Sequence, residues 1–453
     1  MRGAISVDTE RCKGCSLCAV ACPQHIISLS ETVNPKGYPY AVLAQPEQCT
    51  GCASCSIVCP DGCITVTREA PLQLHRGGET VPSSSPRENR ETFCGDAVTT
   101  LLKGNEAIAK AAVRYGYDGF FGYPITPQSE ILETLAADKP WETTGMVVLQ
   151  AESELASINM VYAAGATGKC AMTSSSSPGV ALMQEGISYM AACEIPGLVV
   201  SVGRGGPGLG TIQPGQADYT QAVYGGGNGD YHTIVLAPSS VQEMADFMGL
   251  AKELMFRWRT LVIILSDGVI GQMMERVTLP PYQPRRTDEE IRQQCPWATN
   301  GLGLRQRKYN YASSLELDAA VMEQRNRQMT EKYHQIEQQE VRCEHFMTED
   351  ADCLIVAYGC SARIAMSAVR QLRDKGVRAG LLRPITLWPF PEQQIRQLAE
   401  HQRFILTVEA SEGQMVRDVR YAAEGHCPVH FYGRSGGMIP TPNEIVAAMQ
   451  QHL

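Results

Sequence analysis

The sequence lacks several features that would place it in broad classes of protein. It has no apolar run of about 18 residues, the length that a membrane-spanning helix requires. Its first residues, MRGAISVDTE, contain no apolar signal-peptide core. Basic residues are not in excess, because 39 Lys and Arg stand against 48 Asp and Glu, for a formal net charge of -9. These absences argue against a membrane protein, an exported protein, and a nucleic-acid or anionic-membrane partner.

A disulfide framework is also missing, although the chain contains 17 cysteines. Eight of them form two regular motifs, and the other nine are scattered: Cys63, Cys94, Cys170, Cys193, Cys295, Cys343, Cys353, Cys360 and Cys427. Scattered thiols together with metal-ligating ones are typical of proteins in a reducing compartment. We therefore expect a cytoplasmic protein.

One cysteine spacing occurs in two copies. The first is Cys12-x2-Cys15-x2-Cys18-x3-Cys22-Pro23, and the second is Cys49-x2-Cys52-x2-Cys55-x3-Cys59-Pro60. With this spacing, each copy supplies three thiolates to one [4Fe-4S] cube and sends its fourth to the other. The expected ligands are Cys12, Cys15, Cys18 and Cys59 for the first cluster, and Cys49, Cys52, Cys55 and Cys22 for the second.

A pair of zinc knuckles is the alternative interpretation of these motifs. Zinc takes four ligands per site, and it prefers two paired Cys-x2-Cys hooks or histidine partners. The cysteine triplets fit the corners of an iron–sulfur cube better. The sequence therefore predicts a chain that carries electrons.

The character of the sequence changes along the chain, and 453 residues are too many for one hydrophobic core. Residues 1–68 contain both cysteine motifs and form a predicted ferredoxin-like domain. Residues 69–94 include HRGGETVPSSSPRENRET, whose polar composition predicts a solvated linker.

Residues 95–279 alternate between short apolar runs and helical patterns, which predicts parallel strands joined by crossover helices. The predicted strands are Met146–Leu149, Lys169–Thr173, Leu198–Val202, Thr233–Leu236 and Leu261–Leu265. The predicted helices are Asn105–Tyr115, Pro127–Ala137, Glu152–Gly165, Val180–Cys193 and Val241–Trp258.

Residues 280–350 break this alternation with PPYQPRR and a long polar helix over about 315–343, which we expect to pack across domains or against another subunit. From 351 to 453 the alternation resumes and predicts a second, smaller α/β domain. Its predicted strands are Leu354–Tyr358, Arg378–Leu382, Phe404–Val408 and Val429–Tyr432, and a last helix is expected near Ile445–His452.

A glycine-rich segment follows the predicted strand at 198–202. The run Gly203-Arg204-Gly205-Gly206-Pro207-Gly208 matches G-x-G-x-x-G, but a dinucleotide site needs its last glycine to open a helix. Pro207 and Pro214 prevent that helix, so we expect an irregular loop. Arg204 then lies at the carboxyl end of a strand, where α/β folds bind ligands. The alternative is an arginine that only ties down its loop.

Two further residues are candidates for a binding site. Thr126 precedes Pro127, and the pair predicts a helix N-cap followed by a proline-started helix whose end could also hold an anion. Glu154 shares a helix face with Ile158, Val161 and Gly165. A carboxylate in an apolar stripe is rare unless it is paired or used. A buried structural hydrogen bond remains the alternative for Glu154.

Two motifs are set aside. The tract Thr173–Gly179 (TSSSSPG) lacks the G-x-S-x-G elbow of a serine nucleophile, so we expect a hydroxyl-rich loop that hydrogen-bonds a ligand or backbone. Asp267-Gly268 with Asn300 only loosely imitates a diphosphate–magnesium motif, because Pro- and Arg-rich sequence separates them.

Several segments, in the order of the chain, resemble the alpha subunit of 2-oxoacid:ferredoxin oxidoreductases. They are Lys103–Ala107 (KGNEA), Gly122–Glu130 (GYPITPQSE), Gln150–Met160 (QAESELASINM), Ser176–Tyr189 (SSPGVALMQEGISY) and Gly203–Tyr219 (GRGGPGLGTIQPGQADY). Leu382–Pro391 (LRPITLWPFP) resembles the second, transketolase-C-like domain of that subunit. Residues 1–68 resemble the family's separate delta subunit, here fused.

The resemblance implies an α/β protein with two transketolase-like parallel-sheet domains, preceded by a small ferredoxin-like domain with two [4Fe-4S] clusters. The family uses thiamine diphosphate with Mg²⁺ to decarboxylate a 2-oxoacid, passes two electrons singly to iron–sulfur clusters, and transfers the acyl group to coenzyme A. Glu154 would hydrogen-bond the aminopyrimidine ring, and Thr126 and Arg204 would bind the substrate carboxylate and keto oxygen. The implied cofactor-binding residues are Tyr123, Pro124, Ile125 and Glu154.

One family motif is missing, because no strand-borne Gly-Asp-Gly is followed by Asn about 25–30 residues later. The half of the site that holds the diphosphate and Mg²⁺ is therefore expected on a separate beta subunit. The resemblance also implies a gamma subunit and an external ferredoxin as partners. This chain alone is not expected to catalyse the reaction.

The substrate and the role of the chain each leave an alternative. SSSSPGVALMQEGISY and GRGGPGLGTIQPGQADY most resemble the branched-chain, 2-oxoisovalerate subgroup, and the 2-oxoglutarate subgroup is the runner-up. A non-catalytic electron-relay or scaffold subunit is the alternative of another class. Glu154 separates the two, because a scaffold has no reason to keep a carboxylate on an apolar face. Oxygen-sensitive clusters further predict an anaerobic setting.

Overall fold

The structure, a computed structural model, describes residues 3–52, 54–57, 59, 63–68, 95–299 and 310–453. Two compact units, Met1–Asn89 and Arg90–Leu453, divide the chain and are described separately. The predicted linker at 69–94 lies outside the described residues. Among those described, no helix combines the length and the apolar character needed to cross a membrane.

The first unit is a small β-rich module built around its cysteines. β1 (Gly3–Val7) pairs antiparallel with β4 (Ile64–Arg68), which joins the beginning of the module to its end. β2 (Ile27–Val33) pairs antiparallel with β3 (Pro39–Leu43). The remaining elements are short: α1 (Leu17–Val20), η1 (Pro46–Gln48) and α2 (Ser54–Ile57). The buried core consists mostly of cysteines, with a few aliphatic side chains.

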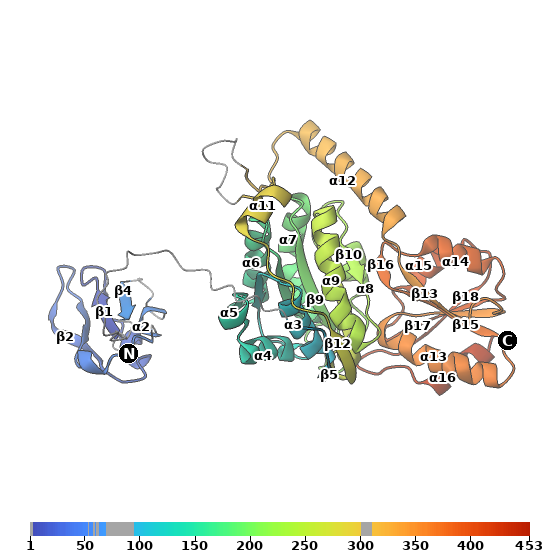
Figure 1. The fold of residues 1–453 in the computed structure, drawn as a ribbon, viewed down its shortest axis with the longest axis horizontal. Coiled ribbons are helices and arrows are strands. Elements are labelled where there is room, and N and C mark those ends of the chain that lie inside the picture. The colour runs from blue at the N-terminus through green and yellow to red at the C-terminus, as the bar shows by residue number, and fades with distance from the viewer. Residues whose placement is uncertain (1–2, 53, 58, 60–62, 69–94, 300–309) are drawn as a thin grey trace. The chain divides into compact units, whose positions relative to one another are not determined.

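The second unit begins with a seven-stranded sheet in the order β16-β10-β11-β9-β8-β6-β7 (Figure 1). Its parallel strands are β6 (Gly119–Gly122), β7 (Val147–Gln150), β8 (Ala171–Ser175), β9 (Gly197–Gly203), β10 (Ile234–Leu236) and β11 (Leu261–Asp267). β8, β9 and β11 are buried along their whole length, which explains the apolar runs Leu198–Val200 in β9 and Leu261–Leu265 in β11, whereas β8 ends in buried hydroxyl residues. Outside this sheet, β5 (Val98–Lys103) pairs antiparallel with β12 (Met274–Leu279).

Helices cover both faces of this sheet, as right-handed crossovers require when the strand order reverses. α4 (Ser129–Asp138) and α9 (Val241–Trp258) pack with α3 (Gly104–Arg114). On the other face, α6 (Glu154–Ala166) packs with α7 (Ser177–Ala192). The shorter helices are α5 (Pro140–Thr143), α8 (Tyr219–Tyr224) and α10 (Gly268–Gln272). All five predicted strands and five predicted helices of this region are present with shifted ends, whereas β5, β6 and β12 were not predicted.

One predicted helix start is wrong. Thr126 is not an N-cap and Pro127 is not the first helical residue, because α4 begins at Ser129 with Gln128 as its N-cap. The physical reason lies outside the helix. The Thr126 carbonyl accepts from the Arg204 guanidinium at 2.9 Å, and the Pro127 carbonyl accepts from the Asn105 amide at 2.7 Å. These distant donors hold the backbone at 126–127 away from the helical conformation.

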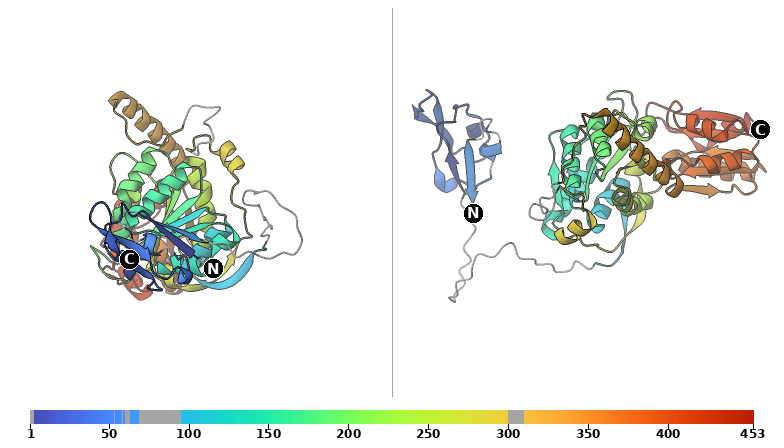
Figure 2. Two further views of the ribbon diagram at one scale, coloured as in Figure 1. Left: turned by 90° about the vertical axis from the view of Figure 1, so that its left-hand side faces the viewer. Right: turned by 90° about the horizontal axis from the view of Figure 1, so that it is seen from above.

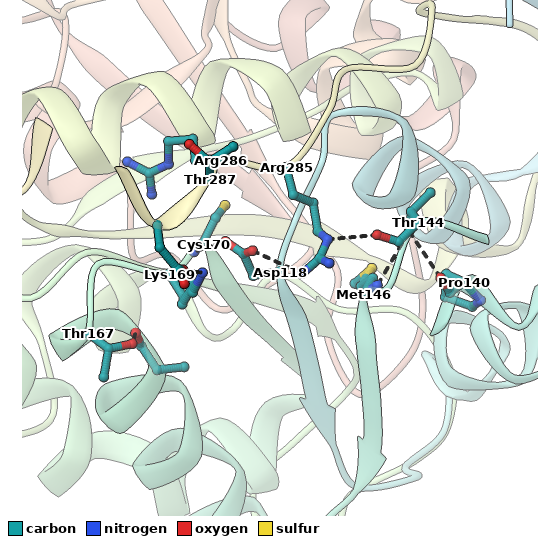
Figure 3. Close-up of polar contacts among 12 residues, drawn as sticks. Asp118, Pro140, Thr144, Met146, Thr167, Lys169, Cys170, Arg285, Arg286 and Thr287 are labelled. Carbon is teal, nitrogen blue, oxygen red and sulfur yellow. Dashed lines mark hydrogen bonds and ion pairs between the residues drawn. The ribbon is translucent and has the colours of Figure 1, made fainter. Parts of the chain in front are cut away.

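The segment after β12 runs back over the first sheet's domain and is not a free linker (Figure 3). Arg285 donates from Nε to the Thr144 carbonyl at 2.8 Å and pairs with Asp118 at 3.3 Å. Asp118 also accepts from the Cys170 backbone N–H at 2.8 Å, just before β8. Arg286 lies over the Phe256 ring. Because Asp118 and Cys170 precede their strands, this segment braces the amino ends of the sheet.

Two helices follow, α11 (Asp288–Gln294) and the long polar α12 (Ala319–Gln339). Figures 1 and 2 show α12 leading from the first sheet's domain to the second. Its first half is exposed, whereas Tyr333 and Ile336 near its end are buried. Lys332 pairs with Glu194, which follows α7, at 2.9 Å. The helix therefore packs on the first domain over its last turns.

The second sheet has the order β13-β15-β14-β17-β18, and all its pairings are parallel except that of β13. Its strands are β13 (Cys343–Phe346), β14 (Cys353–Val356), β15 (Ala379–Pro384), β17 (Ile405–Glu409) and β18 (Val429–Gly433). Its helices are α13 (Gly359–Asp374), α14 (Glu392–Ala399), α15 (Val416–Ala423) and α16 (Pro442–Gln450). The four predicted strands and the last helix are present, and β13 is an additional edge strand.

Two features join the sheets. β16 (Thr386–Trp388) leaves the second domain and pairs antiparallel with β10 at the edge of the first sheet. Gln216, in the loop before α8, bonds only to the second domain through its side chain. Its amide donates to the Tyr358 carbonyl at 2.9 Å, and its carbonyl oxygen accepts from Ser361 Oγ at 2.6 Å and from the Ala410 N–H at 2.9 Å.

Gln216→Ala should lower the stability of the second unit. The substitution leaves the buried Ser361 hydroxyl and the Ala410 N–H without their partner, whereas the Tyr358 carbonyl keeps the Ala362 N–H, and each unpaired group costs about 1–3 kcal/mol. We expect a loss of about 3 kcal/mol, read as a lower midpoint of thermal unfolding by circular dichroism. Gln335→Ala, on an exposed position of α12, is the matched control. An equal midpoint for the two variants would contradict the assigned role of Gln216.

Candidate active site and cluster-binding sites

The candidate residues come from four neighbouring strands of the first sheet. Residues 123–126 follow β6, Glu154 follows β7, the serine tract ends β8, and Arg204 follows β9. Because the carboxyl ends of parallel strands lie along one edge of a sheet, these segments meet there. The hydrogen bond from Arg204 Nη1 to the Thr126 carbonyl, at 2.9 Å, links two of them directly.

Glu154 is the first residue of α6 and is only 5% exposed. Ser153 caps this helix by accepting from the Ala156 N–H at 3.2 Å. The predicted face is confirmed, because Ile158, Val161 and Gly165 are buried with Glu154. Among the described residues, no hydrogen-bond donor or cation pairs with the Glu154 carboxylate. The carboxylate is therefore available to a group that is not part of this chain.

Gly179 on α7 explains how the carboxylate fits. A Cβ atom at this position would lie 2.4 Å from Glu154 Oε1 and 2.0 Å from Ser175 Oγ. Real side chains do not approach so closely, so only glycine leaves room for these two oxygens. The glycine lies in the SSPG stretch that the sequence offered as a hydroxyl-rich loop, but its role could not be recognised from spacing.

Arg204 is 7% exposed and lies in the irregular loop that the sequence predicted, since no helix follows Gly208. A single backbone bridge to Pro214 closes the loop. Besides the bond to the Thr126 carbonyl, the guanidinium keeps a buried Nε that has no partner among the described residues. An arginine fork with unused donors is suited to a carboxylate.

Thr126 and the three residues before it form the segment that follows β6 at this edge of the sheet. Thr126, Tyr123 and Pro124 are exposed and Ile125 is half-buried. Gln128 fixes their turn, because its amide donates to the Tyr123 carbonyl at 3.1 Å and its carbonyl oxygen accepts from Ser174 at 2.5 Å. The Thr126 hydroxyl has no partner among the described residues and is free for a ligand.

Asp218 belongs to this site but was missed. It accepts from Ser177 Oγ at 2.5 Å, and Ser177 also accepts from the Arg204 N–H at 3.0 Å. Burial raises the pKa of Asp218 to about 6, against the opposing effects of Ser177 and Arg204. The residue stands in the GQADY stretch that carries the family resemblance, and this was the only signal for it in the sequence.

The remaining motifs have structural roles. Ser176 donates to the Val202 carbonyl at 2.8 Å, which fits the expected hydroxyl-rich loop. Asp267 is buried and accepts from the backbone N–H groups of Val269, Ile270 and Cys360. Asn300, its suggested companion, lies outside the described residues.

The residues at this edge fit one end of thiamine diphosphate. A free buried carboxylate matches the hydrogen-bonding edge of an aminopyrimidine ring, and unused arginine and threonine donors suit the anionic groups of an oxoacid. Among the described residues, no three His, Cys, Asp or Glu side chains converge on a point where a metal ion would bind.

The eight motif cysteines surround two separate cavities in the first unit. Cys12, Cys15, Cys18 and Cys59 line one of them, and Cys22, Cys49, Cys52 and Cys55 line the other. This grouping, in which Cys22 and Cys59 each cross to the other motif, is the one predicted from spacing. Thiolates around a cavity, rather than around a point, suit the corners of a cube.

The two cysteine loops share a backbone feature. Gly14 and Gly51, each directly before the second cysteine of its motif, have φ of +64° and +67°. Side chains other than glycine rarely adopt this conformation. It bends each loop around its cavity, so the donor set and the loop shape both fit an iron–sulfur cluster.

Known proteins resemble the chain along most of its length. The thiamine-diphosphate-binding domain of pyruvate flavodoxin/ferredoxin oxidoreductases matches residues 110–347, and core domain II of pyruvate:ferredoxin oxidoreductase matches 351–445. A 4Fe-4S dicluster domain matches 11–63. The ketoisovalerate oxidoreductase subunit VorB of Methanothermobacter marburgensis is 47% identical over 78% of this chain and 97% of its own length.

Two further relatives point the same way. The 2-oxoglutarate synthase subunit KorA of Archaeoglobus fulgidus is 38% identical over 78% of this chain and 99% of its own length. The solved 2-oxoglutarate:ferredoxin oxidoreductase of Magnetococcus marinus has a TM-score of 0.67 and 25% identity. The match covers 79% of this chain and 65% of that one, so this chain spans about two thirds of its length.

The sequence motifs, the two parallel sheets and the paired cysteine cavities thus agree with the relatives. The chain belongs to the pyruvate flavodoxin/ferredoxin oxidoreductase family, as a thiamine-diphosphate-binding subunit of a 2-oxoacid:ferredoxin oxidoreductase with an N-terminal 4Fe-4S dicluster domain.

Proposed function

We propose that this chain supplies the aminopyrimidine-binding half of the active site in an oxidoreductase that acts on 2-oxoisovalerate. The overall reaction converts a 2-oxoacid and coenzyme A to an acyl-CoA and CO2, and two electrons leave for ferredoxin through the clusters. The observation that carries the proposal is Glu154, a buried residue whose carboxylate pairs with no donor or cation among the described residues. A scaffold or relay subunit gives no reason for this arrangement.

Glu154 binds the cofactor at its ring. Bound thiamine diphosphate supplies a carbon centre that stabilises the carbanion formed when a 2-oxoacid loses CO2. With thiamine diphosphate bound, the Glu154 carboxylate would accept a hydrogen bond from the ring N–H of the aminopyrimidine and would so favour its imino form, which is the basic form of the ring. The apolar surroundings of α6 keep water from competing for the carboxylate. Tyr123, Pro124 and Ile125 form the adjoining wall.

Arg204 and Thr126 orient the substrate. The buried guanidinium donates from its free Nε to the substrate carboxylate, and the exposed Thr126 hydroxyl donates to the carboxylate or the keto oxygen. Their mutual bond at 2.9 Å keeps the arginine directed at the site when no substrate is bound. Asp218 accepts a hydrogen bond from Ser177, and Ser177 accepts one from the Arg204 backbone N–H. This pair of bonds fixes the start of the loop that carries Arg204.

Other chains complete the enzyme. The missing Gly-Asp-Gly and Asn motif supports a separate beta subunit that holds the diphosphate and Mg²⁺. The relatives are named as subunits, which is consistent with such a partner. We further propose a gamma subunit and an external ferredoxin as partners. We also propose a reducing cytoplasm, because scattered cysteines together with metal-ligating ones are typical of such a compartment.

The substrate follows from the order of similarity. The ketoisovalerate relative is 47% identical to this chain, and the first 2-oxoglutarate relative from the same organism is 36% identical, over 78% and 76% of the chain. We therefore place 2-oxoisovalerate first and 2-oxoglutarate second.

Glu154→Gln should abolish 2-oxoacid-dependent turnover while leaving cluster content and assembly with the partner subunits unchanged. The amide keeps the size of the side chain but loses the proton-accepting charge. Rates are measured as anaerobic reduction of a viologen dye by the assembled complex. Glu152→Gln is the matched control, because Glu152 is exposed two residues earlier and should retain full activity. Unchanged turnover in the Glu154 variant would favour the relay or scaffold alternative.

Arg204→Gln should raise the KM for the 2-oxoacid and lower kcat/KM by about 10- to 100-fold, because a hydrogen bond to a charged group contributes about 1.5–3 kcal/mol. The KM for coenzyme A should stay the same. Arg327→Gln serves as control, since that arginine side chain is 76% exposed on α12. An unchanged KM for the oxoacid in the Arg204 variant would assign this arginine to loop support alone.

The chain alone, with thiamine diphosphate, Mg²⁺ and coenzyme A, should reduce no viologen with any oxoacid, because half of the site is on another subunit. With its beta and gamma partners, reduction should be fastest with 2-oxoisovalerate when compared with 2-oxoglutarate and pyruvate. Faster reduction with 2-oxoglutarate would replace the proposed substrate. Turnover by the chain alone would instead refute the half-site.

A further inference from the structure

The two cluster cavities differ at one equivalent position. Four residues after the last cysteine of each motif, the first copy has Ile26 and the second has Cys63. Ile26 lines the cavity of Cys22, Cys49, Cys52 and Cys55 and is 3% exposed. Cys63 lines the other cavity and is 4% exposed. The internal repeat thus places a thiol beside one cluster site and an aliphatic side chain beside the other.

The Cys63 thiol lies within hydrogen-bond distance of a motif cysteine. Its Sγ is 3.4 Å from Cys59 Sγ. The backbone carbonyl of Cys63 accepts from the Asp8 N–H at 2.8 Å, and β4 begins at the next residue. The main chain therefore fixes the position of the thiol. A cysteine that ligates iron does so as a thiolate and can only accept, so Cys63 must be the donor once Cys59 binds a cluster.

We propose that Cys63 raises the reduction potential of the cluster held by Cys12, Cys15, Cys18 and Cys59, by donating its S–H to the Cys59 ligand. The inference rests on the proposed assignment of Cys59 to that cluster. Reduction adds negative charge to the cluster and its sulfurs, so a donor to a ligand sulfur stabilises the reduced state more than the oxidised state. Cys63 is a positioning residue that acts through Cys59 and is not itself an iron ligand.

The two clusters therefore differ in reduction potential, although their ligand motifs are the same. Ile26 has no donor to offer, so the cluster beside it lacks this stabilisation and takes up an electron at lower potential. An electron shared between the two clusters resides mainly on the one next to Cys63. The first unit therefore has a built-in direction for electron transfer.

The test is an anaerobic redox titration of the full-length chain with both clusters loaded, followed by electron paramagnetic resonance. Cys63→Ala should lower the reduction potential of the higher-potential cluster by up to about 59 mV. For one electron, this shift corresponds to about a tenfold change in the reduction equilibrium. Cys63→Ser keeps a donor and should leave that cluster near its original potential. Iron and sulfide contents equal to those of the unmodified chain exclude loss of a cluster.

The repeat supplies a reciprocal variant. Ile26→Cys places a thiol at the equivalent position and should raise the lower couple, so that the gap between the couples narrows from the other side. If Cys63→Ala leaves both couples unchanged, or if Cys63→Ser shifts the higher couple as far as Cys63→Ala does, the inference is overturned.

Three ligand variants separate this inference from the assignment on which it rests. Cys15→Ser and Cys59→Ser should both change the reduction potential of the higher-potential cluster. Cys52→Ser should change that of the lower-potential cluster. If Cys15→Ser and Cys59→Ser alter different couples, the ligand assignment fails. If they alter the same couple and Cys63→Ala does not move it, the assignment holds and only the role of Cys63 is refuted.

Discussion

The hydrogen bonds of one amide side chain hold the candidate active site in shape. Gln216 lies two residues before Asp218, in the loop that continues from Arg204, and its amide bonds only to the second α/β domain. Asp218 holds Ser177, and Ser177 contacts the Arg204 backbone. The loop that carries Arg204, the proposed substrate-binding residue, is therefore anchored to a domain that contributes none of the candidate cofactor-binding residues.

Local patterns predicted much of the fold. Parallel strands buried on both faces appear in the sequence as apolar runs, and amphipathic helices appear as apolar residues spaced three or four apart. The spacing of Ile158, Val161 and Gly165 correctly placed Glu154 on the buried face of its helix. The grouping of the cysteines around two cavities also agrees with their spacing. The helix face depends on residues close in the sequence, and the cysteine grouping depends on a spacing that is repeated in two copies.

The sequence failed where distant residues decide the local structure. Thr126 and Pro127 carry good helix-start signals, yet side chains from Arg204 and Asn105 bind their carbonyls and delay the helix. Residues 386–388 belong by sequence to the second domain, but they pair with β10 in the first sheet. The contact of Gly179 with the Glu154 carboxylate likewise joins two helices. No periodicity within one segment records such contacts.

The strand β16 also determines how this chain can be divided for engineering. A chimera that exchanged residues 351–453 for those of another family member would import an edge strand of the first sheet along with the second domain. The Gln216 side-chain contacts cross the same junction, and two of them are to backbone atoms, so the donor sequence must keep a hydroxyl at Ser361 and the same backbone path at Tyr358 and Ala410. Within the described part of the first unit, which ends at Asn89, the strands pair with one another, β1 with β4 and β2 with β3. Module exchange is therefore simpler for the electron-carrying unit than for either half of the catalytic one.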